Sequence, residues 1–201
     1  MTLPSASGIV LAGGRSSRFG RDKLTELVDG RPLLHHAVFA IDGVCVETLV
    51  VVAPLADPPP LPAGSSVRVV RDPEPFGGPL VGVVVGLEQA REPLALVVAG
   101  DMPRLQPAVL RAMLHALEDA DAEAIVLRYQ GRDQQLPLAV RNGVATARAR
   151  ALLARGERSL AALVRALRAR GIEETDWRGM DPTAATLSDI DQPSDLARAR
   201  R

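Results

Sequence analysis

Residues 11–23 read L-A-G-G-R-S-S-R-F-G-R-D-K and continue a short apolar run at residues 8–12. The β-branched centre of that run predicts a buried strand. Adjacent glycines, serines, arginines and a final Asp22-Lys23 pair come after it. Glycines let the backbone approach a ligand closely, successive N–H groups form anion-binding nests, and cations offset phosphate charge. The stretch therefore predicts a loop that binds a polyphosphate.

The spacing of this loop excludes two better-known phosphate-binding motifs. Five residues separate Gly14 from Gly20, and Lys23 comes three positions later, so the Walker A pattern does not match. The G-x-G-x-x-G fingerprint of dinucleotide-binding folds is absent too, which argues against a dehydrogenase.

The composition of the 201 residues limits the kinds of binding that we expect. Apolar residues make up 47% and aromatic residues only 2%, so the core must be built from aliphatic side chains. The 24 basic and 24 acidic side chains cancel, and we therefore expect no nucleic acid and no membrane surface as partners. An anion site must come from local clustering of cations, such as the one in residues 15–23.

Cys45 is the only cysteine, which excludes an internal disulfide bond and a cysteine metal cluster. Its neighbours Val44 and Val46 predict a packing role. The chain shows no signal-peptide pattern and no apolar run near the roughly 20 residues that span a bilayer. We therefore expect a cytoplasmic protein.

Expected strands and helices alternate along the chain, which predicts one three-layer α/β domain over residues 1–201 with a mostly parallel, twisted sheet. Pro137 favours an edge or irregular strand, and Gly82 and Gly86, four apart on an expected helix, predict a smooth packing face. Strands are expected at residues 47–53, 67–71, 94–99, 123–128, 136–141, 172–176 and 187–191, with a polar turn at 130–135. Helices are expected at residues 32–41, 79–90, 107–119, 143–154 and 160–170, and from 193 onwards.

Asp101 is the strongest candidate for a metal ligand. It comes directly after the apolar residues 94–99, which are typical of a central parallel strand covered on both faces. A carboxylate at the carboxyl tip of such a strand lies in the crevice where open α/β sheets bind ligands. The alternative is a turn or capping role. The glycine loop and residues 72–78 also follow expected strands, so all three should line one crevice.

The pattern L-A-G-G-x-S-x-R-x-G-x-D-K at residues 11–23 resembles the signature of nucleotidyltransferases built on a Rossmann-like domain. Residues 78–82 read G-P-L-V-G and residues 101–103 read D-M-P. With these two segments the chain is most similar to the molybdenum cofactor guanylyltransferase (MobA) family, within the MobA-like NTP transferases. The resemblance covers nearly the whole chain.

This resemblance implies a reaction: transfer of GMP from GTP to the phosphate of molybdenum-bound molybdopterin, with release of pyrophosphate and with Mg²⁺ as cofactor. It also implies handover of the product to molybdoenzymes or cofactor-insertion proteins. In the implied site Asp101 holds Mg²⁺, and Lys23 and Arg18 carry phosphate charge. The nucleotide contacts implied are Leu11, Ala12, Gly13, Gly14, Lys23, Asp72, Gly78 and Asp101.

Several positions depart from the family pattern or allow two interpretations. Ala53 and Pro54 stand where the family has a base-proximal asparagine, so the preference for GTP over CTP is open. Asp189 and Asp191 replace the usual asparagines near the end, and the sequence does not decide whether they join the metal site. The loop at residues 155–159 resembles the family and either faces an anionic second substrate or is a turn capped by Ser159.

Two kinds of alternative function remain open. The first is another nucleotidyltransferase of the same fold, either a molybdopterin cytidylyltransferase or a sugar-1-phosphate nucleotidyltransferase. The second is a non-catalytic module that binds nucleotide or hands over the cofactor. The presence of both Lys23 and Asp101 argues against the second.

Overall fold

The computed structural model describes residues 5–13, 22–54, 58–72 and 77–199. In these residues seven strands form one sheet in the order β5-β4-β1-β6-β8-β7-β9. Four neighbouring pairs are parallel, and only β8 runs antiparallel to its two neighbours. The strands are β1 (Ala6–Leu11), β4 (Glu47–Val52), β5 (Arg68–Arg71), β6 (Leu94–Ala99), β7 (Ala124–Tyr129), β8 (Arg132–Arg141) and β9 (Ala169–Ile172).

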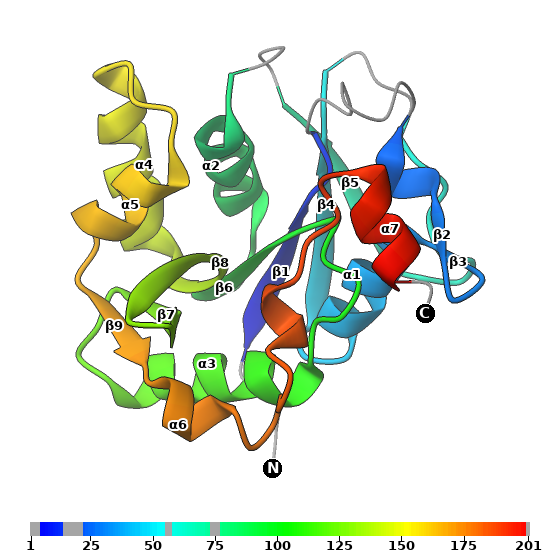
Figure 1. Cartoon of the computed structure of the whole chain (residues 1–201). Coiled ribbons are helices and arrows are strands. Elements are labelled where there is room, and N and C mark those ends of the chain that lie inside the picture. Colours follow the sequence, from blue (N-terminus) through cyan, green and yellow to red (C-terminus); the bar gives the residue numbers. More distant parts are fainter. Residues whose placement is uncertain (1–4, 14–21, 55–57, 73–76, 200–201) are drawn as a thin grey trace.

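Helices cover both faces of this sheet, which confirms the predicted three-layer α/β architecture (Figure 1). One face carries α1 (Leu33–Asp42), α3 (Pro107–Asp119) and the short α6 (Glu174–Trp177). The opposite face carries α2 (Pro79–Gln89), α4 (Asn142–Ala154) and α5 (Leu160–Ala166). The ribbon β2 (Leu27–Val28) with β3 (Arg31–Pro32), the helix α7 (Pro193–Ala199) and the 3₁₀ turns Lys23–Thr25 and Ala185–Leu187 lie beyond these layers.

The core is aliphatic, as the composition requires. Successive strand residues point to opposite faces, so Val10 and Val50 pack toward α1 and α3, while Ile9 and Leu49 pack toward α2. None of the helices in the described ranges has the length and apolar character needed to cross a membrane.

The polar segment predicted as a turn at residues 130–135 is mostly strand. Gln130 and Gly131 both have positive φ, 50° and 73°, which is the geometry of a two-residue hairpin turn. The strands therefore continue to the turn itself, with Tyr129 paired to Arg132.

The expectation of an edge strand at residues 136–141 is wrong, because β8 lies between β6 and β7. Pro137 has no N–H to offer a ladder. It falls where the register with β7 shifts between Val126 and Arg128, just before the paired residue Leu138. The sequence also allowed an irregular strand, and that alternative is confirmed. The register shift accommodates the proline.

Two segments near the end of the chain also differ from prediction. The helix expected at residues 160–170 ends at Ala166, and parallel pairing with β7 draws Ala169–Ile172 into β9. Tertiary pairing here overrides the helical propensity of alanine and arginine. The strand expected at 172–176 is instead mostly the turn of α6, and residues 188–191, expected as strand, follow a 3₁₀ turn without joining a sheet.

Cys45 is buried against the core, as its neighbours predicted. Burial, with a smaller contribution from the Asp42 carboxylate, raises the pKa of its thiol to about 12. The protonated thiol acts as a small apolar side chain.

The close packing predicted for α2 against the sheet depends on Gly86 more than on Gly82. A Cβ on Gly86 would lie 2.5 Å from Ile9 Cγ2 and 3.3 Å from Val51 Cγ2. A Cβ on Gly82 would meet Leu11 Cδ2 at 3.4 Å, an ordinary contact. Close packing of α2 on the sheet therefore requires a glycine at position 86 but not at position 82.

We expect Gly86→Ala to lower the free energy of unfolding by about 1–2 kcal/mol, because the cost of overpacking exceeds the gain in helix propensity. Gly82→Ala is the matched control and should be neutral or stabilising, since it gains up to about 1 kcal/mol of propensity without a clash. Urea unfolding followed by circular dichroism measures both. Equal stability of the two variants would contradict the packing argument.

Candidate functional site

The start of the predicted phosphate loop is held at the carboxyl edge of the sheet, between its neighbours. The backbone N–H of Ala12 donates to Val51 O of β4 at 2.7 Å, and Gly100 N–H donates to Leu11 O at 2.9 Å. The last residue of β1, Leu11, pairs on one side with β4 and on the other with β6. Both hydrogen bonds hold the start of the loop between β4 and β6, at the sheet edge where Asp101 follows β6.

Ala53 borders this loop. A Cβ built on Gly13 would lie 3.4 Å from Ala53 N, so the position that carries a base-proximal asparagine in the family pattern is beside the glycine loop here. Asp72 lies at the same sheet edge, since it follows β5 and donates its N–H to Val52 O at 2.9 Å.

Gly78 precedes α2 with φ +88°, a conformation that favours glycine. A Cβ there would lie 3.0 Å from Arg158 Cβ and 3.2 Å from Arg158 O. The same carbonyl accepts the Leu80 N–H at 3.2 Å. A glycine at position 78 is thus already required by the contact between α2 and the turn that joins α4 to α5.

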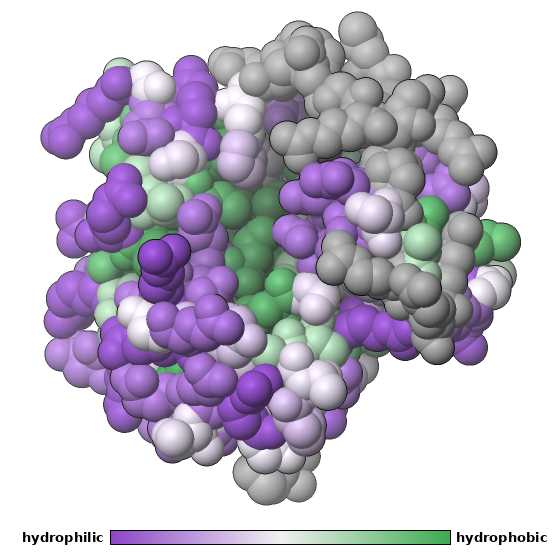
Figure 2. All heavy atoms as spheres, in the orientation of Figure 1, coloured by the Kyte–Doolittle hydropathy of each residue, from purple (hydrophilic) through white to green (hydrophobic). Residues whose placement is uncertain are grey.

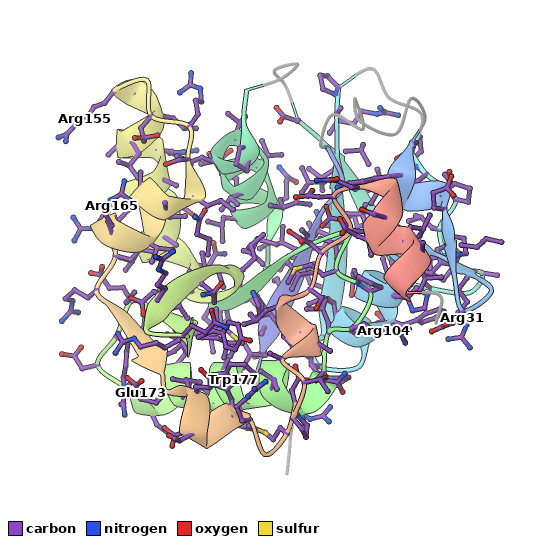
Figure 3. All side chains as sticks on the ribbon, in the orientation of Figure 1. Arg31, Arg104, Arg155, Arg165, Glu173 and Trp177 are labelled. Carbon is purple, nitrogen blue, oxygen red and sulfur yellow. The ribbon has the colours of Figure 1, made fainter. Side chains whose placement is uncertain are left out.

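That turn is the capped helix–helix connection considered above. Ser159 Oγ accepts the N–H of Ala162 at 3.2 Å. Arg155, the first residue of the turn, and Arg165, in α5, point outward from the molecule (Figure 3). These two arginines therefore give no support to the interpretation that the loop faces an anionic substrate.

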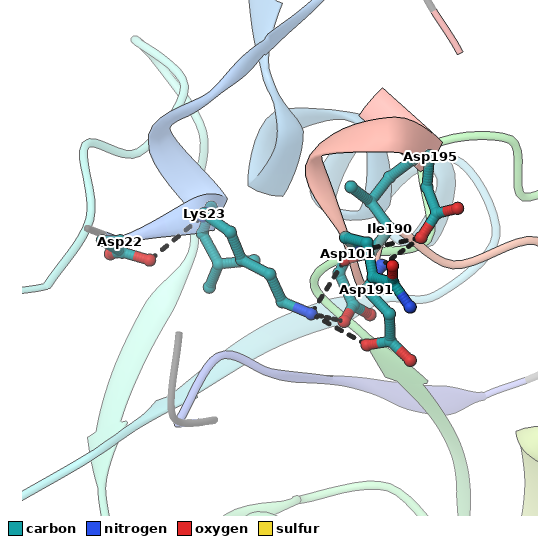
Figure 4. A network of polar contacts seen from close by, with 8 residues as sticks. Asp22, Lys23, Asp101, Ile190, Asp191 and Asp195 are labelled. Atoms are coloured by element: carbon teal, nitrogen blue, oxygen red, sulfur yellow. Dashed lines mark hydrogen bonds and ion pairs between the residues drawn. The ribbon is translucent and has the colours of Figure 1, made fainter. Parts of the chain in front are cut away.

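The main polar cluster of the site is centred on Lys23 (Figure 4). Its Nζ lies 2.6 Å from Asp101 Oδ2 and 3.3 Å from Asp191 Oδ1, and it donates to Ile190 O at 2.9 Å. The Lys23 and Asp101 side chains are only 14% and 16% exposed, whereas Asp191 is 55% exposed. One ammonium therefore joins segments from the beginning, the middle and the end of the chain.

Local structure fixes the backbone on the lysine side of this cluster. Asp22 Oδ1 accepts the Leu24 N–H at 3.0 Å and caps the 3₁₀ turn, and Glu26 N–H donates to Lys23 O at 3.1 Å. The Leu24 side chain is buried in the core. The turn is therefore anchored, and the long Lys23 side chain extends from it.

Apolar burial fixes the opposite side. Ile190 is buried in a small cluster with Val28, Leu33 and Leu196, and its N–H donates to Asp101 O at 3.0 Å. Asp195 Oδ2, in the first turn of α7, accepts the N–H groups of residues 191 and 192 at 3.1 and 2.8 Å. These contacts set where Asp191 presents its carboxylate.

The charges in the cluster affect each other's protonation. Burial lowers the pKa of Lys23, but the hydrogen bonds and charges of Asp101 and Asp191 outweigh it, and the pKa is raised. Desolvation raises the pKa of Asp189, and repulsion from Asp191 and Asp101 adds to it. The lysine is cationic at neutral pH, and the carboxylates outnumber it.

Asp101 has the features of a cation ligand. Its Oδ1 is buried and has no hydrogen-bond partner among the described residues, and such an atom is costly unless something binds it. The described residues contain no group of three or more His, Cys, Asp or Glu side chains arranged for a metal. Asp101 and Asp191 contact Lys23 in the described part of the chain, and Mg²⁺ usually takes one or two carboxylates from a protein alongside phosphate oxygens and water.

A cavity of about 580 Å³ adjoins the cluster. Asp189, Asp191 and Arg104 line it, and Arg104 forms an ion pair with Asp29 at 2.8 Å. Figure 2 shows a wider hollow with an apolar floor on the same view of the molecule, bordered by hydrophilic side chains.

The structure thus brings Lys23 and Asp101 into contact and places Leu11, Ala12, Gly13 and Asp72 along the same sheet edge. Gly14 and Arg18 lie outside the described residues, so their predicted roles stay predictions. The sequence did not indicate the carbonyl of Ile190, and it left the role of Asp191 undecided. The sequence signal for Asp191 was that the family pattern has asparagine at this position.

Comparison with known proteins agrees with this geometry. Residues 8–171 match the MobA-like NTP transferase domain. A probable molybdenum cofactor guanylyltransferase from Chloroflexus aggregans is 40% identical over 194 residues, 94% of this chain and 91% of that protein. A protein of the same name from Mycobacterium tuberculosis is 38% identical over 182 residues, 88% of this chain and 87% of its own length.

Solved structures show the same fold at lower identity. Molybdopterin-guanine dinucleotide biosynthesis protein A from Archaeoglobus fulgidus superposes with a TM-score of 0.80 at 20% identity, covering 96% of both chains. The 2-C-methyl-D-erythritol 4-phosphate cytidylyltransferase from Thermus thermophilus gives 0.69 at 22% identity, with the same coverage. On the strength of the matched domain and of relatives aligned along most of their length, this chain belongs to the MobA-like NTP transferase family.

Proposed function

We propose that this protein transfers GMP from GTP to the phosphate of molybdenum-bound molybdopterin and releases pyrophosphate. The proposal assigns the reaction to one nucleotidyltransferase domain over residues 1–201, acting in the cytoplasm, with later handover of the product to molybdoenzymes or cofactor-insertion proteins. The observation that carries it is the 2.6 Å contact between Lys23 and Asp101. The relatives named molybdenum cofactor guanylyltransferase, at 38–40% identity, support the choice of substrates.

The chemistry requires little covalent participation by the protein. The attacking group is a phosphate oxygen of the acceptor, which is already ionised, so no histidine base or serine nucleophile is needed. The protein must align two anions and reduce their repulsion. Two unit charges about 4 Å apart repel by about 4 kcal/mol at an effective dielectric constant near 20. A partly buried ammonium and a carboxylate with an unpartnered oxygen, both at one edge of the sheet, suit this task.

Lys23 provides the positive charge. In the proposed reaction its ammonium donates to the β- and γ-phosphates and stabilises pyrophosphate as it leaves, and Arg18 is predicted to assist. The backbone at Leu11, Ala12 and Gly13 approaches the base and ribose in the proposed complex.

Asp72 and Gly78 complete the proposed nucleotide contacts. Asp72 is supported by its position beside β4 at the same sheet edge. Gly78 is supported by its position at the beginning of α2. Since packing on Arg158 already accounts for a glycine there, its contact with nucleotide rests on the resemblance alone.

Asp101 would hold Mg²⁺. The unpartnered Oδ1 of Asp101 and the carboxylate oxygens around Lys23 fit a hard cation that prefers oxygen ligands. A Mg²⁺ ion held there would supply positive charge that offsets the negative charge of the transferred phosphate group.

A nucleotide panel tests the proposed function. With molybdopterin, molybdate and Mg²⁺ present, pyrophosphate release should occur with GTP and be at least tenfold slower with CTP, ATP or UTP. Calorimetry should show GTP binding more tightly than CTP. A preference for CTP would identify the cytidylyltransferase instead, and no pyrophosphate release with any nucleotide would favour the non-catalytic alternative.

Replacing Lys23 tests its catalytic role. We expect Lys23→Ala to lower the turnover rate more than tenfold, because the departing pyrophosphate loses its cationic partner. Arg165→Ala is the matched control, since it removes an exposed cation that points away from the body of the protein. Pyrophosphate release measures both rates, and unchanged turnover in Lys23→Ala would remove the lysine from the proposed mechanism.

Replacing Asp101 tests the metal assignment. Asp101→Asn should abolish the Mg²⁺-dependent activity, because an amide is a poorer ligand for this hard cation than a carboxylate. Asp119→Asn, at the exposed end of α3, serves as the control for loss of one carboxylate. The measurement is the rate of pyrophosphate release over a Mg²⁺ titration. A wild-type Mg²⁺ response in Asp101→Asn would be incompatible with the assignment.

A further inference from the structure

The ammonium of Lys23 is surrounded by oxygen atoms in the way that a bound cation is. Asp101 Oδ2, Ile190 O and Asp191 Oδ1 lie 2.6, 2.9 and 3.3 Å from Nζ. Two of these atoms carry carboxylate charge and the third is a backbone carbonyl. Carboxylate and carbonyl oxygens are the ligands that hard divalent cations take from proteins.

The identity of the side chain at position 23 is informative as well. The chain has 24 basic residues, and Lys23 is the only lysine among them. Arginine presents a planar fork of donors, whereas lysine presents a compact, strongly hydrated point charge on a flexible stem. A point charge is the better substitute for a small metal ion between two carboxylates.

One further atom favours a cation of higher charge than lysine. Asp101 Oδ1 is buried and unpartnered in the described part of the chain, although Oδ2 of the same carboxylate binds Lys23. The ammonium therefore satisfies the carboxylate only in part.

We propose that Lys23 is a placeholder for a divalent cation: without nucleotide its ammonium occupies a cation site formed by Asp101 and Asp191, and it leaves when phosphates provide new acceptors. The inference rests on the proposed function for the identity of that nucleotide. It adds that Asp191 is a ligand-forming residue of this chain, and that Lys23 makes cation binding depend on nucleotide binding.

The coupling follows from charge and space. A divalent ion on Asp101 Oδ2 and an ammonium 2.6 Å from the same oxygen would repel strongly at such short range. A triphosphate removes the conflict, because its oxygens accept the hydrogen bonds of Nζ. The 3₁₀ turn anchors the backbone of Lys23, so the change requires only rotation of the side chain.

Binding of Mn²⁺ without nucleotide tests the proposal, with the unbound ion measured by electron paramagnetic resonance. The wild type should bind weakly. Lys23→Met, which keeps an unbranched chain without the charge, should bind at least tenfold more tightly. Adding Asp191→Asn to Lys23→Met should remove most of this gain. Adding Asp119→Asn, the control for loss of one carboxylate at the exposed end of α3, should preserve most of it.

Thermal unfolding gives a second readout if Lys23→Met is less stable. Mn²⁺ should raise its melting temperature more than that of the wild type, because a cation that binds only the folded state stabilises it. The proposal is overturned if Lys23→Met binds Mn²⁺ no more tightly than the wild type, or if the Asp191→Asn double variant keeps the full gain. Neither measurement uses nucleotide, so failure of GMP transfer would leave this test intact.

Discussion

The parallel pairing of β1 with β4 on one side and β6 on the other is the constraint on which the site depends. Three carboxyl ends then meet at one edge, and the hydrogen bonds from Ala12 to Val51 and from Gly100 to Leu11 tie them together. Residues that follow these strands are brought to the same place although they are far apart in the sequence. The aliphatic core supports this arrangement, since helices cover both faces and leave the edge as the place for polar chemistry.

How much could be predicted from the sequence depended on whether the signal was local. The strand Leu94–Ala99 and the helix Pro107–Asp119 match their predicted limits, because a continuous apolar run and a leading proline are local signals. The strand β8 was misjudged, since its outer half is polar and is held by pairing with β7 across a two-residue turn. This pairing is local in the chain, but residues 132–135 read R-D-Q-Q and lack the apolar alternation that marks a strand.

The candidate site shows the same division. Lys23 and Asp101 could be assigned to one crevice, because each follows an expected strand and the topology of open sheets brings such positions together. The contribution of Ile190 could not, since a backbone carbonyl has no sequence signature and its position depends on burial against Val28 and Leu33. The position of Asp191 likewise depends on a tertiary contact of its neighbour, since the Ile190 N–H donates to Asp101 O.

The contact between Lys23 and Ile190 spans 167 positions of the chain. In the described residues no strand of the sheet follows Ile172. The cation cluster therefore depends on a segment that contributes no strand to the sheet. If this segment detached, circular dichroism could still report folded secondary structure, although Lys23 would have lost its contacts with Ile190 and Asp191.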